Sequence, residues 1–132
     1  MILPDFGRLY AAQRFQVVNT TENDHVDPDR EPFRVSTREY IYRLVMNKGH
    51  VIEWHWHPQG NSHERRPHIH PAIDPKAHLP GPRFAMEDVI ESCIQLGAKP
   101  SREDWAARLL ESGGIHKLYR TWVNEPGERQ AT

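Results

Sequence analysis

The sequence predicts an α+β protein in which an antiparallel β-meander carries two C-terminal helices packed on one face. Three observations indicate this fold class: a strand–turn–strand pattern over residues 39–57, two amphipathic helical stretches beyond residue 84, and proline- and glycine-rich turns between them. Strands joined by short turns pair antiparallel, and their apolar face needs a covering layer. A chain of 132 residues can form one domain with its own core, so residues 1–132 are expected to be a single domain.

The N-terminal part contains one predicted strand and one polar loop. Residues 14–19 alternate apolar and polar side chains, which is typical of a half-buried strand. Residues 20–32 contain five acidic side chains against Arg30 alone, and this composition predicts a solvated acidic loop. The polar residues 124–132 are expected to form a frayed tail.

Residues 39–57 are expected to form two strands joined at Asn47-Lys48-Gly49, where glycine can adopt positive φ. A two-residue loop would set Leu44 against Glu53, whereas a three-residue loop pairs like with like. Because a slip of one residue exchanges the two faces, the three-residue loop is the expected register. It makes Met46 face His50 and pairs Leu44 with Ile52, Tyr42 with Trp54 and Tyr40 with Trp56 on one face, and Val45 with Val51, Arg43 with Glu53, Ile41 with His55 and Glu39 with His57 on the other.

Histidines are concentrated after this turn, and six of the nine lie between residues 55 and 78. The predicted register directs His55 and His57 away from the tryptophan face. After a loop over residues 58–66, His68-Ile69-His70 would form a short third strand with both histidines outward. Prolines at both ends of this segment predict an edge strand or a bulged piece, and an exposed edge over residues 67–72 would favour a homodimer.

Two helices are expected after an irregular crossing at residues 75–82. Apolar side chains recur every three and four positions over residues 85–96, and Gly97 stands where a C-terminal cap belongs. Residues 101–104 resemble a capping box that would start the second helix, with Asp104 and Arg108 paired four apart. Gly113-Gly114 would end this helix, and a last strand could follow within residues 115–123. The predicted buried face of this second helix consists of Trp105, Ala106, Leu109 and Leu110.

The overall composition argues against several classes of protein. Lys and Arg number 17 and Asp and Glu 18, so no net field attracts nucleic acid or a membrane surface. The single Cys93 cannot form an internal disulfide, which suits a reducing cytoplasm. No apolar stretch approaches the roughly 18 residues that span a bilayer, and residues 1–5 show no signal-peptide pattern. A cytoplasmic protein without a membrane partner is therefore expected.

Metal binding is one interpretation of the histidines. Residues two apart on a strand project from the same face, about 6 to 7 Å apart at Cα. Two such pairs on neighbouring strands would bring three or four imidazoles to one ion, each nitrogen about 2.0 to 2.1 Å away. The ion would be a divalent transition metal, with zinc favoured; the alternative is that no ion binds and the histidines are ordinary surface residues. The predicted ligands are His55, His57, His68 and His70, with His63, Glu64 or Glu53 as replacements.

Acid–base chemistry on RNA is a second interpretation. Two imidazoles facing a phosphodiester, with cations for the developing negative charge, can promote cleavage by the 2′-hydroxyl group. His68 and His70 would be the catalytic pair, supported by His55 and His57. Between residues 33 and 83 there are eight basic and four acidic side chains. The predicted nucleic-acid contacts in this basic region are Arg65, Arg66, Lys76 and Arg83.

Three segments resemble those of the TumE-type toxins of bacterial toxin–antitoxin pairs. They are Tyr40-x-Tyr42-Arg43-Leu44, Arg66-Pro67-His68-Ile69-His70, and a helix opening with Glu87-Asp88-Val89-Ile90. The resemblance covers residues 38–95 and depends mainly on Pro67, His68 and His70. The N-terminal strand, the acidic loop, the doubled His-Trp-His and the Trp105 helix depart from it. The resemblance implies an antitoxin protein as partner and an action on nucleic acid or translation, with the Pro-His segment at the working surface.

These observations rank three functions. The first is a small toxin-like protein that acts on RNA through a histidine-rich sheet face with an adjacent arginine pair. The alternatives are a metal-binding protein or metalloenzyme that uses the same histidines, and a non-enzymatic interaction module. Whether the protein is an enzyme stays open; an enzyme of this kind would be a ribonuclease-like hydrolase or a histidine-ligated metalloenzyme.

Overall fold

A computed structural model of the chain describes residues 1–19, 33–60 and 63–123. The predicted acidic loop at 20–32 and the predicted tail at 124–132 lie outside the described residues. The elements in chain order are β1 (Ile2–Leu3), β2 (Gly7–Asn19), β3 (Phe33–Met46), β4 (Val51–Trp56), β5 (His68–His70), β6 (Leu79–Pro80), α1 (Met86–Gln95), α2 (Trp105–Tyr119) and β7 (Arg120–Trp122).

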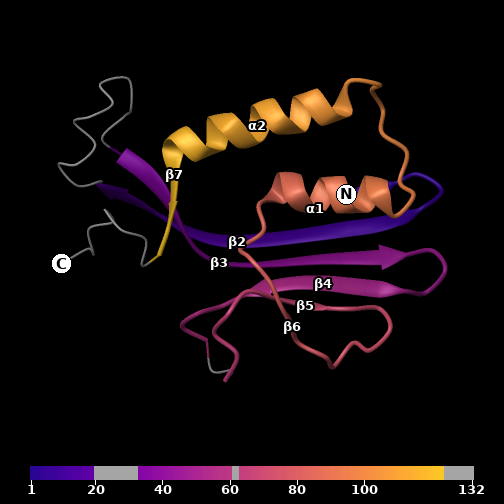
Figure 1. The fold of residues 1–132 in the computed structure, drawn as a ribbon, viewed down its shortest axis with the longest axis horizontal. Coiled ribbons are helices and arrows are strands. Elements are labelled where there is room, and N and C mark those ends of the chain that lie inside the picture. Colours follow the sequence, from indigo (N-terminus) through magenta and orange to yellow (C-terminus); the bar gives the residue numbers. More distant parts are fainter. Residues whose placement is uncertain (20–32, 61–62, 124–132) are drawn as a thin grey trace.

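The strands form one sheet in which β1 to β6 are neighbours in chain order, each antiparallel to the next. Both helices follow the meander in sequence, and α1 lies between α2 and the strands in Figure 1. This arrangement confirms the predicted α+β meander with its two C-terminal helices. The strand β7 adds an unpredicted feature, because it runs parallel to the first residues of β3.

The register of β3 with β4 agrees with the sequence prediction. Tyr40 pairs with Trp56, Tyr42 with Trp54, and Leu44 lies opposite Ile52. The turn between the strands is closed by a hydrogen bond from the Gly49 amide to the Met46 carbonyl, 2.9 Å long. Gly49 has a φ of 94°, which an L side chain rarely adopts, and this explains why glycine ends the turn. The alternation of β4 therefore presents tryptophan on one face and histidine on the other.

The aromatic face of β3 and β4 forms the core with α1. Tyr40, Tyr42 and Trp54 are at most 3% exposed and belong to the same cluster as Val89 and Cys93 of the helix. The apolar stripe predicted for residues 85–96 is thus confirmed as the packing face of α1. Gly97, with a φ of 127°, ends this helix. The amides of residues 97 and 98 donate hydrogen bonds to the carbonyls of residues 94 and 93, which is the Schellman arrangement.

The third strand forms where it was predicted, but its position in the sheet differs. β5 pairs with β4 on one side and with β6 on the other, so His68 faces Pro80 and Ile69 faces Leu79. The prediction of an exposed edge over residues 67–72 is therefore wrong. Proline is tolerated in the neighbouring edge strand because a residue there need not donate a hydrogen bond to a further strand.

The strand β2 is longer than the segment predicted at 14–19. It begins at Gly7 and pairs with β3 along its whole length, with an irregularity between Arg14 and Phe15. Leu9, near its start, is 2% exposed and belongs to the core. The long partner strand β3 stabilises residues whose own pattern gave no clear signal.

The second helix departs from its prediction at both ends. Its N-cap is Asp104 rather than Ser101, and the helix continues through Gly113-Gly114 to Tyr119, so residues 115–119 are helical and only Arg120–Trp122 form a strand. The side chains of Ser112 and His116 both contact Glu87 of α1, at 2.8 and 2.5 Å. These tertiary contacts on either side of the glycine pair offset their low helix propensity.

The predicted buried face of α2 is also wrong in part. Trp105 and Leu109 are half-buried, whereas Ala106 is exposed and Leu110 is 80% exposed. The helix contacts α1 more than it contacts either β3 or β7, and a helix covers fewer side chains than a sheet face does. The predicted pair of Asp104 with Arg108 is confirmed at 3.3 Å. Neither described helix is long and apolar enough to cross a membrane.

Candidate metal centre

Strands β4 and β5 bring the two histidine pairs together on the face opposite the tryptophans. His55 lies directly across from His68, and Glu53 lies across from His70. Since residues two apart share a face, Trp54 and Ile69 turn to the core side while the imidazoles turn to the other. The predicted common face of His55, His68 and His70 is confirmed.

Five imidazole rings are gathered at this place, which we call the histidine cluster (His55, His57, His68, His70 and His78). The ring centroids of His55 and His70 are 4.5 Å apart, and His68 lies 5.4 Å from His55 and 5.0 Å from His70. His57 is 5.3 Å from His68. His78, whose ring stacks on His68 at 4.7 Å, was not among the predicted ligands. Its only signal in the sequence was membership of the run of histidines between residues 55 and 78.

Three of these rings can hold a metal ion together. His55, His68 and His70 each offer a ring nitrogen, and the three nitrogens lie within 4.8 Å of one another. Imidazole nitrogens around a tetrahedral zinc ion are about 3.3 Å apart, as their bond lengths of about 2.0 to 2.1 Å require. Small rotations of the side chains would therefore suffice to bring all three onto one ion.

Backbone carbonyls orient two of the three rings. Nδ1 of His68 lies 2.9 Å from the Arg66 carbonyl oxygen, and Nδ1 of His70 lies 2.9 Å from that of Pro75. A carbonyl oxygen only accepts, so Nδ1 donates in both hydrogen bonds and Nε2 keeps its lone pair. Metal-ligating histidines in proteins usually have such a partner on the other nitrogen. Both rings are therefore set to ligate through Nε2.

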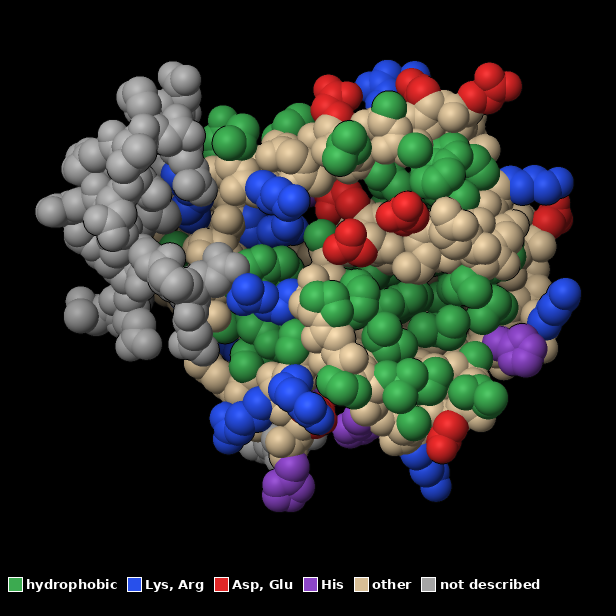
Figure 2. All heavy atoms as spheres, viewed as in Figure 1, with side chains coloured by type: hydrophobic (Ala, Val, Ile, Leu, Met, Phe, Trp, Pro, Cys, Tyr) green, Lys and Arg blue, Asp and Glu red, His purple; other side chains and the backbone are tan. Residues whose placement is uncertain are grey.

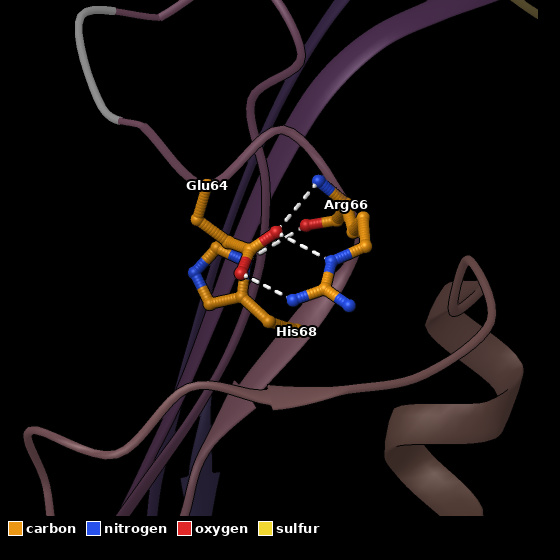
Figure 3. Close-up of polar contacts among 3 residues, drawn as sticks. All are labelled: Glu64, Arg66 and His68. Atoms are coloured by element: carbon orange, nitrogen blue, oxygen red, sulfur yellow. Dashed lines mark hydrogen bonds and ion pairs between the residues drawn. The ribbon is translucent and has the colours of Figure 1, made fainter.

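The carbonyl that orients His68 belongs to a tightly bonded turn (Figure 3). Glu64 accepts hydrogen bonds from the Arg66 amide at 3.1 Å and from the Arg66 guanidinium at 2.9 Å through each of its oxygens. These bonds lower the pKa of the Glu64 carboxyl to about 2. Glu64 was a predicted replacement ligand, but its carboxylate is occupied by Arg66 instead, and it acts to hold the segment that leads into β5.

The environment keeps the buried rings neutral. Burial, and to a lesser extent the neighbouring imidazoles, lower the pKa of His55 to about 4. His68, which is 1% exposed, also has a lowered pKa, again chiefly because of burial. Neutral imidazole is the form that ligates a metal, so both rings are ready to bind at neutral pH.

The nitrogen Nε2 of His55 is buried and has no hydrogen-bond partner among the described residues. The nearest carboxylate oxygen, Oε2 of Glu53, lies 3.7 Å away, beyond hydrogen-bond distance. A buried polar nitrogen without a partner is costly, and such groups in native proteins call for an explanation such as an absent ion. A metal ion held with His68 and His70 would satisfy it.

The four basic residues predicted to contact nucleic acid differ in their surroundings. Arg66 is paired with Glu64, and Arg65 donates to the Pro58 carbonyl at 3.0 Å. Arg83 lies over the rings of Trp56 and Trp122, on the aromatic side of the sheet. Lys76 lies in the turn between β5 and β6, where its amide bonds to Asp74. His63, another of the three predicted replacement ligands, is exposed.

Comparisons of this chain with protein families, with curated proteins and with solved structures found no match in any of the three. The properties of the site therefore rest on its own geometry.

Proposed function

We propose that this protein binds a divalent transition metal ion, with zinc favoured, through His55, His68 and His70. The observation that carries the proposal is the buried, unpartnered Nε2 of His55 beside two rings whose Nδ1 atoms are already bonded to carbonyls. Three imidazoles without a thiolate suit zinc, copper or nickel. The single cysteine, Cys93, lies in the core on the other side of β4, so it does not contribute to this donor set.

Three protein ligands leave a fourth position on a tetrahedral ion. Water there would make the centre of the kind found in zinc enzymes, whereas a fourth imidazole would close it, as in structural sites. His57 and His78 are the candidates for a closing ligand because each lies next to His68. Zinc titrations of the single variants His57→Ala and His78→Ala distinguish the two cases. An open centre keeps its zinc affinity in both variants, whereas a closed centre loses affinity in one of them.

The test is metal content and affinity of the protein purified without a polyhistidine tag. We expect about one zinc ion per chain by elemental analysis, as one three-imidazole centre holds one ion. The triple variant His55→Ala/His68→Ala/His70→Ala should lose it. His50→Ala, which removes an exposed imidazole at the turn, is the matched control and should keep the wild-type content. Absence of stoichiometric metal, or equal content in the triple variant, would contradict the proposal.

Toxin-like action on RNA stays a second proposal. It is supported by the grouping of the predicted catalytic residues His55, His57, His68 and His70 within one cluster. Expression of the wild type and of His68→Ala/His70→Ala in metal-depleted and zinc-supplemented cells tests it. Growth arrest or RNA cleavage by the wild type alone would support it, and equal behaviour of the two chains would remove it. A partner antitoxin and a homodimer likewise stay predictions.

A further inference from the structure

A second candidate site lies on the aromatic side of the sheet, away from the histidine cluster. It is a cavity of about 520 Å³ between β2, β3, the start of α1 and the C-terminal end of α2. Small-molecule sites usually measure about 300 to 1,000 Å³ and are mostly apolar with a few polar groups. Apolar walls are supplied by Ala11, Val35, Met86 and Tyr119, and none of the five clustered histidines is among its described lining residues.

The hydroxyl of buried Tyr42 and the amide of exposed Gln13 border the cavity. The Tyr42 side chain is fully buried, and its hydroxyl oxygen lies 2.5 Å from Nε2 of Gln13. Burial raises the pKa of Tyr42, so the hydroxyl keeps its proton. The Gln13 amide donates to the Tyr42 hydroxyl oxygen, so the buried hydroxyl proton has no acceptor among the described residues. A ligand oxygen in the cavity would supply that acceptor and remove the penalty of an unsatisfied buried donor.

Positive charge is available at the same cavity. Arg120 lines it, and its guanidinium group is held over the Trp122 ring, 4.8 Å from the ring centroid. His116 lines it too, but its Nδ1 is paired with the Glu87 carboxylate and is not available to a ligand. No acidic side chain is among the described lining residues of this cavity. Arg120 is therefore the cation that remains for a ligand.

Further cations lie close to this end of α2. Arg83 and Lys117 line the groove between α1 and α2, which shares Arg120 with the cavity. Figure 2 shows Lys and Arg side chains gathered where the C-terminal end of α2 meets β7, with hydrophobic side chains beside them. Glu87, Asp88 and Glu91 line the same groove, so the positive charge is concentrated at the end next to Arg120.

We propose that this cavity binds a small organic carboxylate with an apolar or aromatic body. The carboxylate accepts hydrogen bonds from Arg120 and from the Tyr42–Gln13 pair, while the apolar part packs against Ala11, Val35 and Met86. Hydrogen bonds to charged groups are stronger than those between neutral groups, and the guanidinium is already positioned by its stacking on Trp122. The site is separate from the proposed metal centre and does not depend on it.

The experiment compares 4-phenylbutyrate with its uncharged amide, 4-phenylbutyramide, by isothermal titration calorimetry and protein-observed NMR. The measurements use the variant His55→Ala/His68→Ala/His70→Ala in the presence of a chelator, so that no metal ion in the histidine cluster can bind the carboxylate. We expect the acid to bind with a dissociation constant of about 1 mM or tighter and the amide about tenfold more weakly.

Two variants test the assignment of the polar groups. Arg120→Gln and Tyr42→Phe should each weaken binding of the acid about tenfold, while Arg108→Gln, a change on the exposed surface of α2, should leave it unchanged. Tyr42→Phe keeps the ring in the core and covers the case in which Arg120→Gln disturbs β7. The proposal is overturned if the acid and the amide bind alike, if both variants bind as the parent does, or if the acid does not bind at concentrations up to about 5 mM.

Discussion

The two faces of strand β4 have opposite chemistry within six residues. Trp54 and Trp56 are 3% and 5% exposed and are covered by the core around α1. His55, between them, faces a cluster of polar rings assembled by β5 and the segment that leads into β6. The same alternation of the backbone produces both faces, but only one is packed against a helix. Stability and the proposed metal binding are therefore assigned to separate faces, and each can be altered with limited effect on the other.

The largest expected effect comes from the aromatic face. Trp54→Ala removes a buried indole from the core and should lower the free energy of unfolding by about 3 to 5 kcal/mol. The matched change on the other face, His57→Ala, should lower it by less than about 1 kcal/mol in metal-free protein. Urea denaturation followed by circular dichroism measures both. Losses of similar size would mean that the two faces do not divide stability and binding in this way.

The histidine face should respond to pH where the aromatic face does not. The folded pKa of His55, about 4, lies below its ordinary value of 6.5, so the unfolded chain binds a proton more readily than the folded chain. The free energy of unfolding of metal-free protein should therefore fall as the pH decreases from 6.5 to 4, and the loss should level off below that. One pKa unit corresponds to about 1.4 kcal/mol, so this residue contributes at most about 3.5 kcal/mol.

The control for this pH effect is His55→Gln, which cannot titrate. Thermal unfolding between pH 7 and pH 4, with a chelator present, should show a shallower decline for this variant than for the wild type. Burial lowers the pKa of His68 as well, so His68→Gln should also make the decline shallower. Parallel curves for all three proteins would show that the buried rings do not govern stability in this range.

The smallest effect concerns the turn that orients His68. Arg66→Ala releases the Glu64 carboxylate and loosens the carbonyl that accepts from His68, so zinc affinity should fall about three- to tenfold. The neighbouring Arg65→Ala removes only a bond to the Pro58 carbonyl and should change it less than twofold. A competition titration with a chromophoric chelator distinguishes them. Identical affinities in the two variants would show that this turn does not position the ring.

The strand pair was predictable from sequence because its determinants are local. The turn glycine, the alternation of β4 and the matching of aromatic residues opposite one another fix one register, and a slip would expose the indoles. The same alternation carried through to His68 and His70, since Pro67 and Pro71 delimit a segment too short for anything but one strand. Hence the four predicted ligands lie in one cluster as expected, and three of them can hold one ion together.

The helical end was less predictable because its determinants are distant in sequence. Gly113-Gly114 is a local signal to end a helix, but Glu87 of α1 bonds residues on both sides of the pair. The exposed Leu110 shows that an apolar repeat does not by itself decide which side chains find a partner. In the same way, His78 joins the cluster only because the chain folds back after β5, where the Pro75 carbonyl meets His70.

By itself the sequence determined the meander, its register and the side of the sheet on which the paired histidines lie, since these follow from the two-residue period of a strand. Only the tertiary structure decided which rings meet, which nitrogens are already bonded and which one is left buried without a partner. Those properties depend on carbonyls and rings brought in by separate segments, whose approach no local pattern encodes. The same holds for the Tyr42–Arg120 cavity, which exists only once α2 has packed beside β3.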